Sequence, residues 1–248
     1  MAFDSIKGTL ADLEGVFAGH PKKLWDGKPL SSIQKDRLDV CVSVSFEGIG
    51  GDSQADLKLH GGPDKAVSFY PSEHYPVWNR EIGVTNKVFS PGSFGENISS
   101  GIYTEKNVCI GDIFRLGHCE LQVTQGRTPC WKLNKHTGVE KMAEFFLKTG
   151  RTGWYFRVLK EGDFLIDSKL ELIDRKHESY TVYEITMARV SLFNSPKRYM
   201  EISRIPELSD GWKKSFSRKA AQVEQDSPTI AWKEPNSTNE PDSTHSRC

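Results

Sequence analysis

A succession of strand-like stretches between residues 38 and 177 limits the folds open to this chain. In the first, residues 38–48, alternating Val40, Val42, Val44 and Phe46 indicate a strand with one buried face. Glycine-containing turns separate several of the later ones. The strand-like stretches are residues 38–48, 65–71, 94–99, 107–117, 118–125, 153–164 and 169–177. We therefore expect a mainly β fold with added helices, of the α+β class.

Two helices are expected within this strand-rich region. Residues 138–150 place apolar side chains on one face and end at a glycine, which is typical of an amphipathic helix. Residues 72–83 also predict a short helix that Ser72 can cap, although Pro76 disfavours a helix interior.

The pattern becomes helical after His177. Thr181 and Glu184 form a capping box, and further helices can start at Ser195 and Ser209. We expect residues 179–223 to form a small three-helix unit that leans on the sheet or on a partner. Residues 1–37 are interpreted as a leader segment, residues 38–175 as the main domain, and residues 224–248 as a disordered, Pro- and Ser-rich tail.

Composition excludes several classes of protein. Lys plus Arg and Asp plus Glu both total 33, so no overall charge favours nucleic acid or an anionic membrane surface. No signal-peptide core or membrane span of about 20 apolar residues is visible, so we expect a soluble cytoplasmic protein. The cysteines number 5, an odd count without zinc-site spacing, and reduced thiols are expected.

A glycine-rich loop, "LHGGPDKA" at residues 59–66, is one candidate binding site. Gly61 and Gly62 let a ligand approach the backbone, and His60 and Lys65 can meet an anion from the sides. A plain Gly-Gly-Pro turn between strands explains the same residues. The spacing fits neither a P-loop nor a dinucleotide-binding fingerprint.

A second candidate is "SFGENIS" at residues 93–99. Glu96 could accept hydrogen bonds from ring N–H groups, and Asn97 could both donate and accept on the edge of a heterocycle. Asn97 could equally satisfy its own turn.

The strongest candidate is "QGRTPCWKL" at residues 125–133. Pro129 should end the preceding strand, so that Cys130 begins a short helix with Arg127 and Lys132 nearby. A helix N-terminus in a cationic setting favours the thiolate, which can attack an electrophile or bind a soft metal.

Three roles for Cys130 remain open from the residues alone. A hydrolase nucleophile would need a histidine base, for which His60 and His136 are candidates. A metal ligand would need further ligands from a cofactor, because no clustered His, Cys or carboxylate set is visible. A buried, inert thiol is the third role, and it suits the strand positions of Cys41 and Cys109 better.

Four motifs together resemble the MOSC domain proteins of the YiiM type, which are homologous to the C-terminal domain of molybdenum cofactor sulfurase. The motifs are "GDSQADLKLHGGPDKAVSFYPSEHYPVW", "FGENIS", "VCIGDIFRLG" and "QVTQGRTPCWKLN". The resemblance runs from about Leu38 to Ile173, and the later helices match the family's C-terminal 3-alpha domain. One departure is Gly126, where relatives often have proline; we expect a looser loop before Arg127.

The resemblance implies a β-barrel-like, mainly antiparallel fold that holds a molybdenum cofactor, Mo-molybdopterin, with Cys130 as the protein ligand to the metal. The cofactor would supply the other ligands. The residues that we expect to contact the cofactor or substrate are His60, Gly61, Gly62, Lys65, Glu96, Asn97, Gln125, Arg127, Lys132 and Asn134.

The resemblance also implies an activity, the reduction of N-hydroxylated compounds such as 6-hydroxylaminopurine to amines, with electrons from a separate redox protein. A sulfur-carrier module with a persulfide on Cys130, and a cofactor-binding protein without turnover, are the alternatives. A fused sulfurase domain with a pyridoxal-phosphate-binding lysine would favour the sulfur carrier. We expect 248 residues to leave no room for one, which favours the reductase.

Overall fold

The computed structural model describes residues 6–56, 61–82, 87–190 and 195–226. Of the expected tail, which was predicted from residue 224 onward, residues 227–248 lie outside these ranges, as does His60. The β-strands are β1 (Leu10–Ala11), β2 (Leu13–Ala18), β3 (Asp36–Arg37), β4 (Val42–Ser45), β5 (Gly48–Ile49), β6 (Val67–Pro71), β7 (Ile98–Ser100), β8 (Ile113–Leu116), β9 (Cys119–Gly126), β10 (Trp154–Lys160), β11 (Gly162–Phe164) and β12 (Leu170–Asp174). The α-helices are α1 (His74–Ile82), α2 (Trp131–Thr137), α3 (Met142–Thr149), α4 (Val182–Val190), α5 (Pro196–Ser203) and α6 (Asp210–Asp226).

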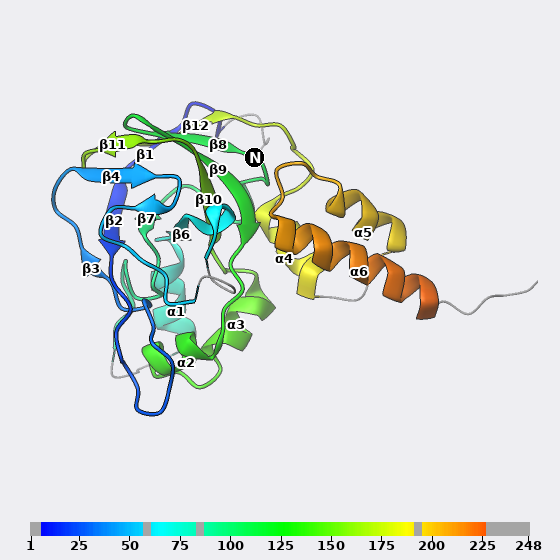
Figure 1. The fold of residues 1–248 in the computed structure, drawn as a ribbon, viewed down its shortest axis with the longest axis horizontal. Helices are drawn as coiled ribbons and strands as arrows, with labels where there is room; N and C mark the ends of the chain where they lie inside the picture. Colours follow the sequence, from blue (N-terminus) through cyan, green and yellow to red (C-terminus); the bar gives the residue numbers. More distant parts are fainter. Residues whose placement is uncertain (1–5, 57–60, 83–86, 191–194, 227–248) are drawn as a thin grey trace, which may run out of the picture.

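The main sheet closes into a barrel through its N-terminal segment. Its strand order is β1-β12-β8-β9-β10-β6-β7-β2-β3. β1 and β2 are consecutive along the chain, yet β1 pairs with β12 and β2 pairs with β7, at opposite ends of this order. The sheet therefore returns on itself as a barrel (Figure 1). The mainly β, α+β fold that we predicted is confirmed.

This closure differs from the expectation for residues 1–37. That segment was interpreted as a leader before the domain, but it contains β1, β2 and β3 of the main sheet. Without it, β7 and β12 would each expose an unpaired edge. The segment is thus part of the barrel wall.

The strand at residues 38–48 is shorter than predicted. β4 spans Val42–Ser45, where Val42 and Val44 are buried as expected. Val40 and Phe46 lie outside the strand and are 67% and 53% exposed. β4 pairs with β11 and β5 in a separate three-stranded sheet.

Aromatic side chains fill the barrel core, where the strands meet in fixed register. Trp154 of β10 pairs with Gly126 of β9 on one side and with Phe69 of β6 on the other. Its ring stacks on Phe69 at 4.2 Å between centroids. Because β10 pairs with both strands, it sets the position of the end of β9, from which the chain continues to Cys130.

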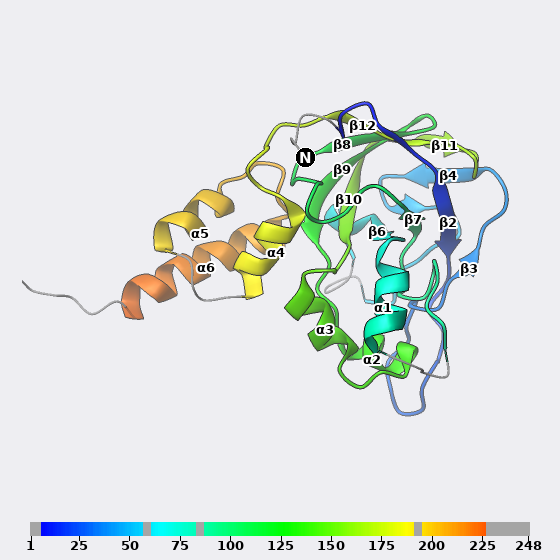
Figure 2. The same cartoon turned by 180° about the vertical axis from the view of Figure 1, so that it is seen from behind.

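Helices α1, α2 and α3 cover one end of the barrel around a second apolar cluster (Figure 2). Trp78 of α1 stacks on Phe146 of α3 with ring centroids 5.3 Å apart. The helix predicted at 138–150 is α3, and it ends as expected at Gly150, whose φ of 70° suits glycine. α1 matches the helix predicted at residues 72–83.

The three-helix unit is present and leans on the barrel (Figure 1). Its capping box forms as predicted, with Glu184 N–H donating to Thr181 Oγ1 at 3.1 Å. Ser195 caps α5 by accepting from Arg198 N–H at 3.2 Å. The N–H of Ser209, just before α6, donates to the β9 carbonyl of Thr124 at 3.1 Å. α6 continues to Asp226, beyond the boundary expected at residue 223.

Candidate functional site

A pocket of about 130 Å³ opens where β9 leaves the barrel and α2 begins. Its wall is formed mainly by residues 31–35, 52–56, 65–68 and 127–133, and by single residues such as Gly95 and Asn97 from other parts of the chain. Five of the predicted site residues line it, namely Lys65, Asn97, Arg127, Cys130 and Lys132. The structure therefore brings together residues that the sequence placed in three separate motifs.

Cys130 occupies the position predicted for it. β9 ends at Gly126, Pro129 follows, and Cys130 is the N-cap residue of α2 with an extended backbone at φ −128°. The thiol is half-buried in the wall of the pocket. A helix start at the pocket wall presents this side chain to a ligand.

The other described cysteines lie elsewhere. Burial raises the pKa of the Cys109 thiol to about 12 and that of Cys119 to about 11, so both stay protonated. Cys109 is thus the buried, inert thiol that we predicted. The same prediction was wrong for Cys41, which lies just outside β4 and is exposed.

Arg127 lines the pocket and is held by two hydrogen bonds. Its backbone N–H donates to Gly153 O at 3.0 Å, and Nη2 donates to Phe94 O at 2.7 Å. Its Nη1 is buried and has no hydrogen-bond partner among the described residues. Ser32 Oγ, also in the pocket wall, is buried and unpartnered in the same way. Such groups are costly to leave unpaired, so this part of the pocket suits an oxygen-rich, anionic ligand.

A buried ion pair, Lys35 with Asp52, lines the same pocket. The two side chains are 6% and 7% exposed. Asp52 Oδ1 also accepts from Gly19 N–H at 2.8 Å, and Asp52 Oδ2 accepts from Asn97 Nδ2 at 2.9 Å. Burial lowers the pKa of Lys35, against the opposing effect of Asp52.

Sequence reasoning missed this pair, together with Ser32. Lys35 lies in the segment interpreted as a leader, and Asp52 lies in a glycine-rich loop. The only signal available was the polar run "SSIQK" after a Gly-Lys-Pro turn, which resembles any exposed loop.

Glu96 and Asn97 serve the protein's own backbone. Glu96 is fully buried and accepts from Tyr75 Oη and from the N–H groups of Gly92 and Phe94. Asn97 accepts from Ser68 and donates to Asp52 and to the Phe17 carbonyl. The side-chain carbonyl and NH₂ groups of Asn97 therefore both have partners within the protein. Its contact with a cofactor stays a prediction.

Gln125 and Asn134 lie behind the pocket wall. Gln125 Oε1 accepts from Ser209 Oγ at 2.6 Å, which ties β9 to the three-helix unit. Asn134 Oδ1 accepts from Ala143 N–H at 2.8 Å, which joins α2 to α3. Neither residue belongs to the lining of the pocket in the described part of the chain.

The glycine-rich loop contributes one residue to the pocket. Lys65 ends the short 3₁₀ helix Pro63–Lys65, and burial lowers its pKa. Gly62 precedes this helix with a φ of 93°, which glycine adopts readily. Gly61 and Gly62 are not part of the described lining, and His60 lies outside the described residues.

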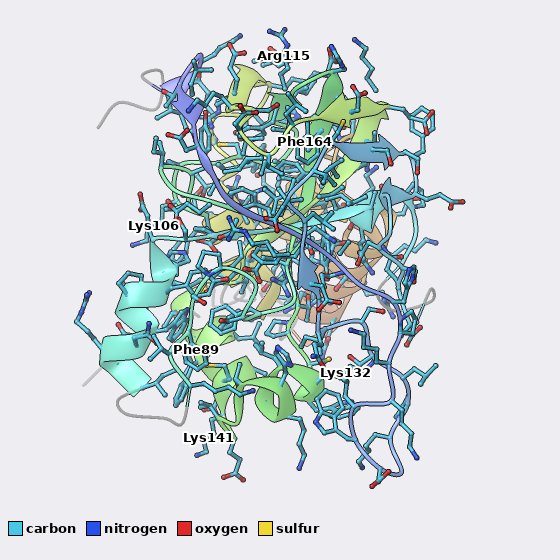
Figure 3. The ribbon with its side chains drawn as sticks, turned by 90° about the vertical axis from the view of Figure 1, so that its left-hand side faces the viewer. Phe89, Lys106, Arg115, Lys132, Lys141 and Phe164 are labelled. Carbon is cyan, nitrogen blue, oxygen red and sulfur yellow. The ribbon has the colours of Figure 1, made fainter. Side chains whose placement is uncertain are left out.

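Lys132 lies at the rim of the pocket. Figure 3 shows it at the start of α2, close to the N-terminal loop, and its Nζ donates to Leu30 O at 3.1 Å. Arg115 lies at the opposite end of the molecule in the same view. Lys132 therefore joins the loop before β3 to the segment that carries Cys130.

Gly126 allows close packing rather than a loose loop. A Cβ atom at this position would lie 2.1 Å from Thr186 Oγ1 and 3.2 Å from the Trp212 ring. The three-helix unit thus approaches the β9 backbone directly before Arg127, which corrects the expectation of a looser loop.

Comparison with known proteins identifies the family. The MOSC domain model matches residues 56–171. YiiM of Escherichia coli (strain K12) is 36% identical over 204 residues, which cover 82% of this chain and 90% of that protein. The chain belongs to the MOSC domain family. The uncharacterized protein YflK of Bacillus subtilis (strain 168) is 42% identical over 206 residues, 81% of this chain and 90% of YflK.

Solved structures place this MOSC protein with the YiiM type. The crystal structure of YiiM from Geobacillus stearothermophilus has a TM-score of 0.72 at 29% identity and covers 85% of this chain and 99% of that one. YiiM from Escherichia coli also gives a TM-score of 0.72, at 30% identity, with 87% and 94% covered. A longer protein of Gibberella moniliformis (strain M3125 / FGSC 7600), named Reductase, is 36% identical over 172 residues, 68% of this chain and 30% of that protein.

The donor groups of the pocket fit the cofactor that the MOSC family suggests. Cys130 offers one soft sulfur ligand. Arg127 Nη1 and Ser32 Oγ, which have no partner within the described ranges, offer donors for an anionic group, and Lys65 and Lys132 add positive charge. The described residues contain no cluster of three or more His, Cys, Asp or Glu side chains that could hold a metal ion. The same residues contain no helix long and apolar enough to cross a membrane.

Proposed function

We propose that this MOSC protein binds the molybdenum cofactor and reduces N-hydroxylated compounds, such as 6-hydroxylaminopurine, to amines. The observation that carries the proposal is the position of Cys130 in one pocket wall with Arg127 Nη1 and Ser32 Oγ, which have no hydrogen-bond partner among the residues that the structure describes. This arrangement supports a ligand that has both a soft metal and an anionic group. The name of the longer fungal relative, Reductase, supports redox chemistry.

Each of the named lining residues would have its own role in this function. Cys130 would be the single protein ligand of the metal, and Arg127 and Ser32 would hold the anionic part of the cofactor by charge-assisted and neutral hydrogen bonds. Lys65 and Lys132 would add positive charge at the rim. When bound, the cofactor supplies two-electron redox chemistry.

The overall reaction consumes two electrons and two protons. The N–O bond of R–NH–OH breaks, and the products are R–NH₂ and water. A separate redox protein would deliver the electrons, and the protons would come from the pocket and from solvent.

A direct test is anaerobic reduction of 6-hydroxylaminopurine with reduced methyl viologen as the electron donor. We expect protein purified from a host that makes the cofactor to form adenine, measured by chromatography. We expect Cys130→Ser to form none, and the matched variant Cys109→Ser to remain active because Cys109 lies away from the pocket.

The alternatives give different results in the same preparation. Cyanide-labile sulfur on Cys130 without adenine formation would indicate the persulfide carrier. Bound cofactor with neither sulfur nor adenine would indicate a binding protein without turnover. Either result would contradict the proposal.

A further inference from the structure

The Lys35–Asp52 pair places two opposite charges in the wall of the pocket. Both side chains are almost fully buried, at 6% and 7% exposure. Taking two charges out of water costs several kcal/mol for each ion, and apolar residues of similar size often stabilise a protein equally well. A buried pair that also lines a ligand pocket therefore suggests a chemical role.

Asp52 holds Lys35 in place. Its two carboxylate oxygens accept from Gly19 N–H and from Asn97 Nδ2, besides Lys35. Asn97 is itself fixed by Ser68 and the Phe17 carbonyl. The carboxylate is therefore rigid and acts as a fixed anchor for the ammonium group.

The ammonium group of Lys35 has unused donors. It carries three N–H bonds, and its one hydrogen bond among the described residues is to Asp52. Because Lys35 lines the pocket, a bound molecule can reach the remaining donors. The charged groups around it are Asp52, Arg127 and Glu96.

Three other ionisable side chains that line the pocket, those of Arg127, Asp52 and Lys132, are less suited to give a proton. Arg127 does not release its proton in proteins. Asp52 accepts hydrogen bonds on both oxygens, and Lys132 donates to a carbonyl at the rim. Lys65 also lines the pocket but is only half-buried, whereas the side chain of Lys35 is almost fully buried.

We propose that Lys35 is the proton donor to the leaving hydroxyl group of the N-hydroxylated substrate, and that Asp52 is the residue that positions it. This inference rests on the proposed function. The ammonium N–H gives its proton to the oxygen as the N–O bond breaks, and water leaves. The two electrons come from the redox protein, a solvent proton goes to nitrogen, and the neutral amine of Lys35 regains its proton from solvent.

The first experiment compares Lys35→Met and Lys35→Arg with wild type in the viologen assay. Loss of a general acid typically lowers the rate about 10²–10⁴-fold, so we expect kcat to fall at least about 100-fold in both variants. We expect KM and the molybdenum content to change little. Lys22→Met is the matched control, because Lys22 forms an exposed ion pair with Asp36 and does not line the pocket.

The second experiment follows the pH dependence of kcat in Asp52→Asn. Activity requires protonated Lys35, so it should be lost as pH rises through the pKa of Lys35. Asp52 favours the charged lysine, so its removal should move this alkaline limb to lower pH. Acetic anhydride labelling of Lys35 at several pH values, followed by mass spectrometry, should show the same displacement without turnover.

Three results would overturn the inference while leaving the reductase intact. They are an unchanged kcat in Lys35→Met, loss of molybdenum together with activity in both Lys35 variants, and an alkaline limb that does not move in Asp52→Asn. The second result would make Lys35 a cofactor anchor. Absence of adenine with wild-type protein would instead remove the proposed function, and the inference with it. If Lys35→Met does not fold, the Asp52→Asn profile and the labelling carry the test.

Discussion

Arg127 depends on a buried carboxylate that does not touch it. Glu96 accepts the N–H of Phe94, whose carbonyl accepts Nη2 of Arg127 at 2.7 Å. Glu96 also accepts from Gly92 N–H and Tyr75 Oη. The turn that was predicted to contact a cofactor edge thus supports, through the Phe94 carbonyl, the guanidinium of Arg127 in the pocket lining.

Glu96→Gln should destabilise the protein by about 1–3 kcal/mol, because an amide NH₂ group would face a backbone N–H that has lost its acceptor. The free energy of unfolding in urea measures this. Glu140→Gln is the control, since Glu140 is exposed, and it should change stability little. Equal stability of both variants would show that the Glu96 carboxylate is not needed in the turn.

At the scale of single residues, the sequence predicted site residues that share one short motif but missed those that are far apart along the chain. Cys130 and Arg127 were predicted because one short motif carries both, and the strand end at Pro129 fixes their setting. Lys35 and Asp52 were missed because they are 17 positions apart, in loops that only the barrel brings together. The side chains of Lys35 and Asp52 form part of a site only because the fold brings them together.

Elements with strong local signals matched the sequence. α1 forms although it contains Pro76, because the third helical position lies in the first turn, where a backbone N–H has no partner within the helix. The strand of residues 13–18 was missed because Gly15 and Glu14 interrupt the apolar pattern. Its partner β7 lies far along the chain, so the local sequence pattern of residues 13–18 does not indicate this pairing.

Contact between β9 and α4 gives a prediction at this scale. Gly126→Ala should cost about 1–3 kcal/mol of unfolding free energy, because the new Cβ would lie 2.1 Å from Thr186 Oγ1. Thr186→Ala in the same chain should recover part of this loss, measured as a double-mutant cycle. Gly211→Ala is the matched control, because a Cβ there meets nothing within 4 Å. Additive effects of the two substitutions would contradict the contact.

At the scale of the whole molecule, the first strands of the chain close the barrel. Deletion of residues 1–19 should abolish cooperative unfolding, because β7 and β12 lose their partners. Deletion of residues 227–248, the part of the predicted tail that follows α6, should leave the thermal transition unchanged. Circular dichroism on heating measures both. A cooperative transition in the shorter N-terminal variant would show that this segment is a dispensable leader after all.

The central claim is that one cysteine of the chain holds a molybdenum cofactor. The direct measurement is the molybdenum content of protein purified from a host that makes the cofactor, determined for wild type, Cys130→Ser and Cys109→Ser. We expect a one-to-one ratio of metal to chain in wild type and in Cys109→Ser, and loss of the metal in Cys130→Ser. Equal molybdenum in the two variants, or none in wild type, would contradict the account.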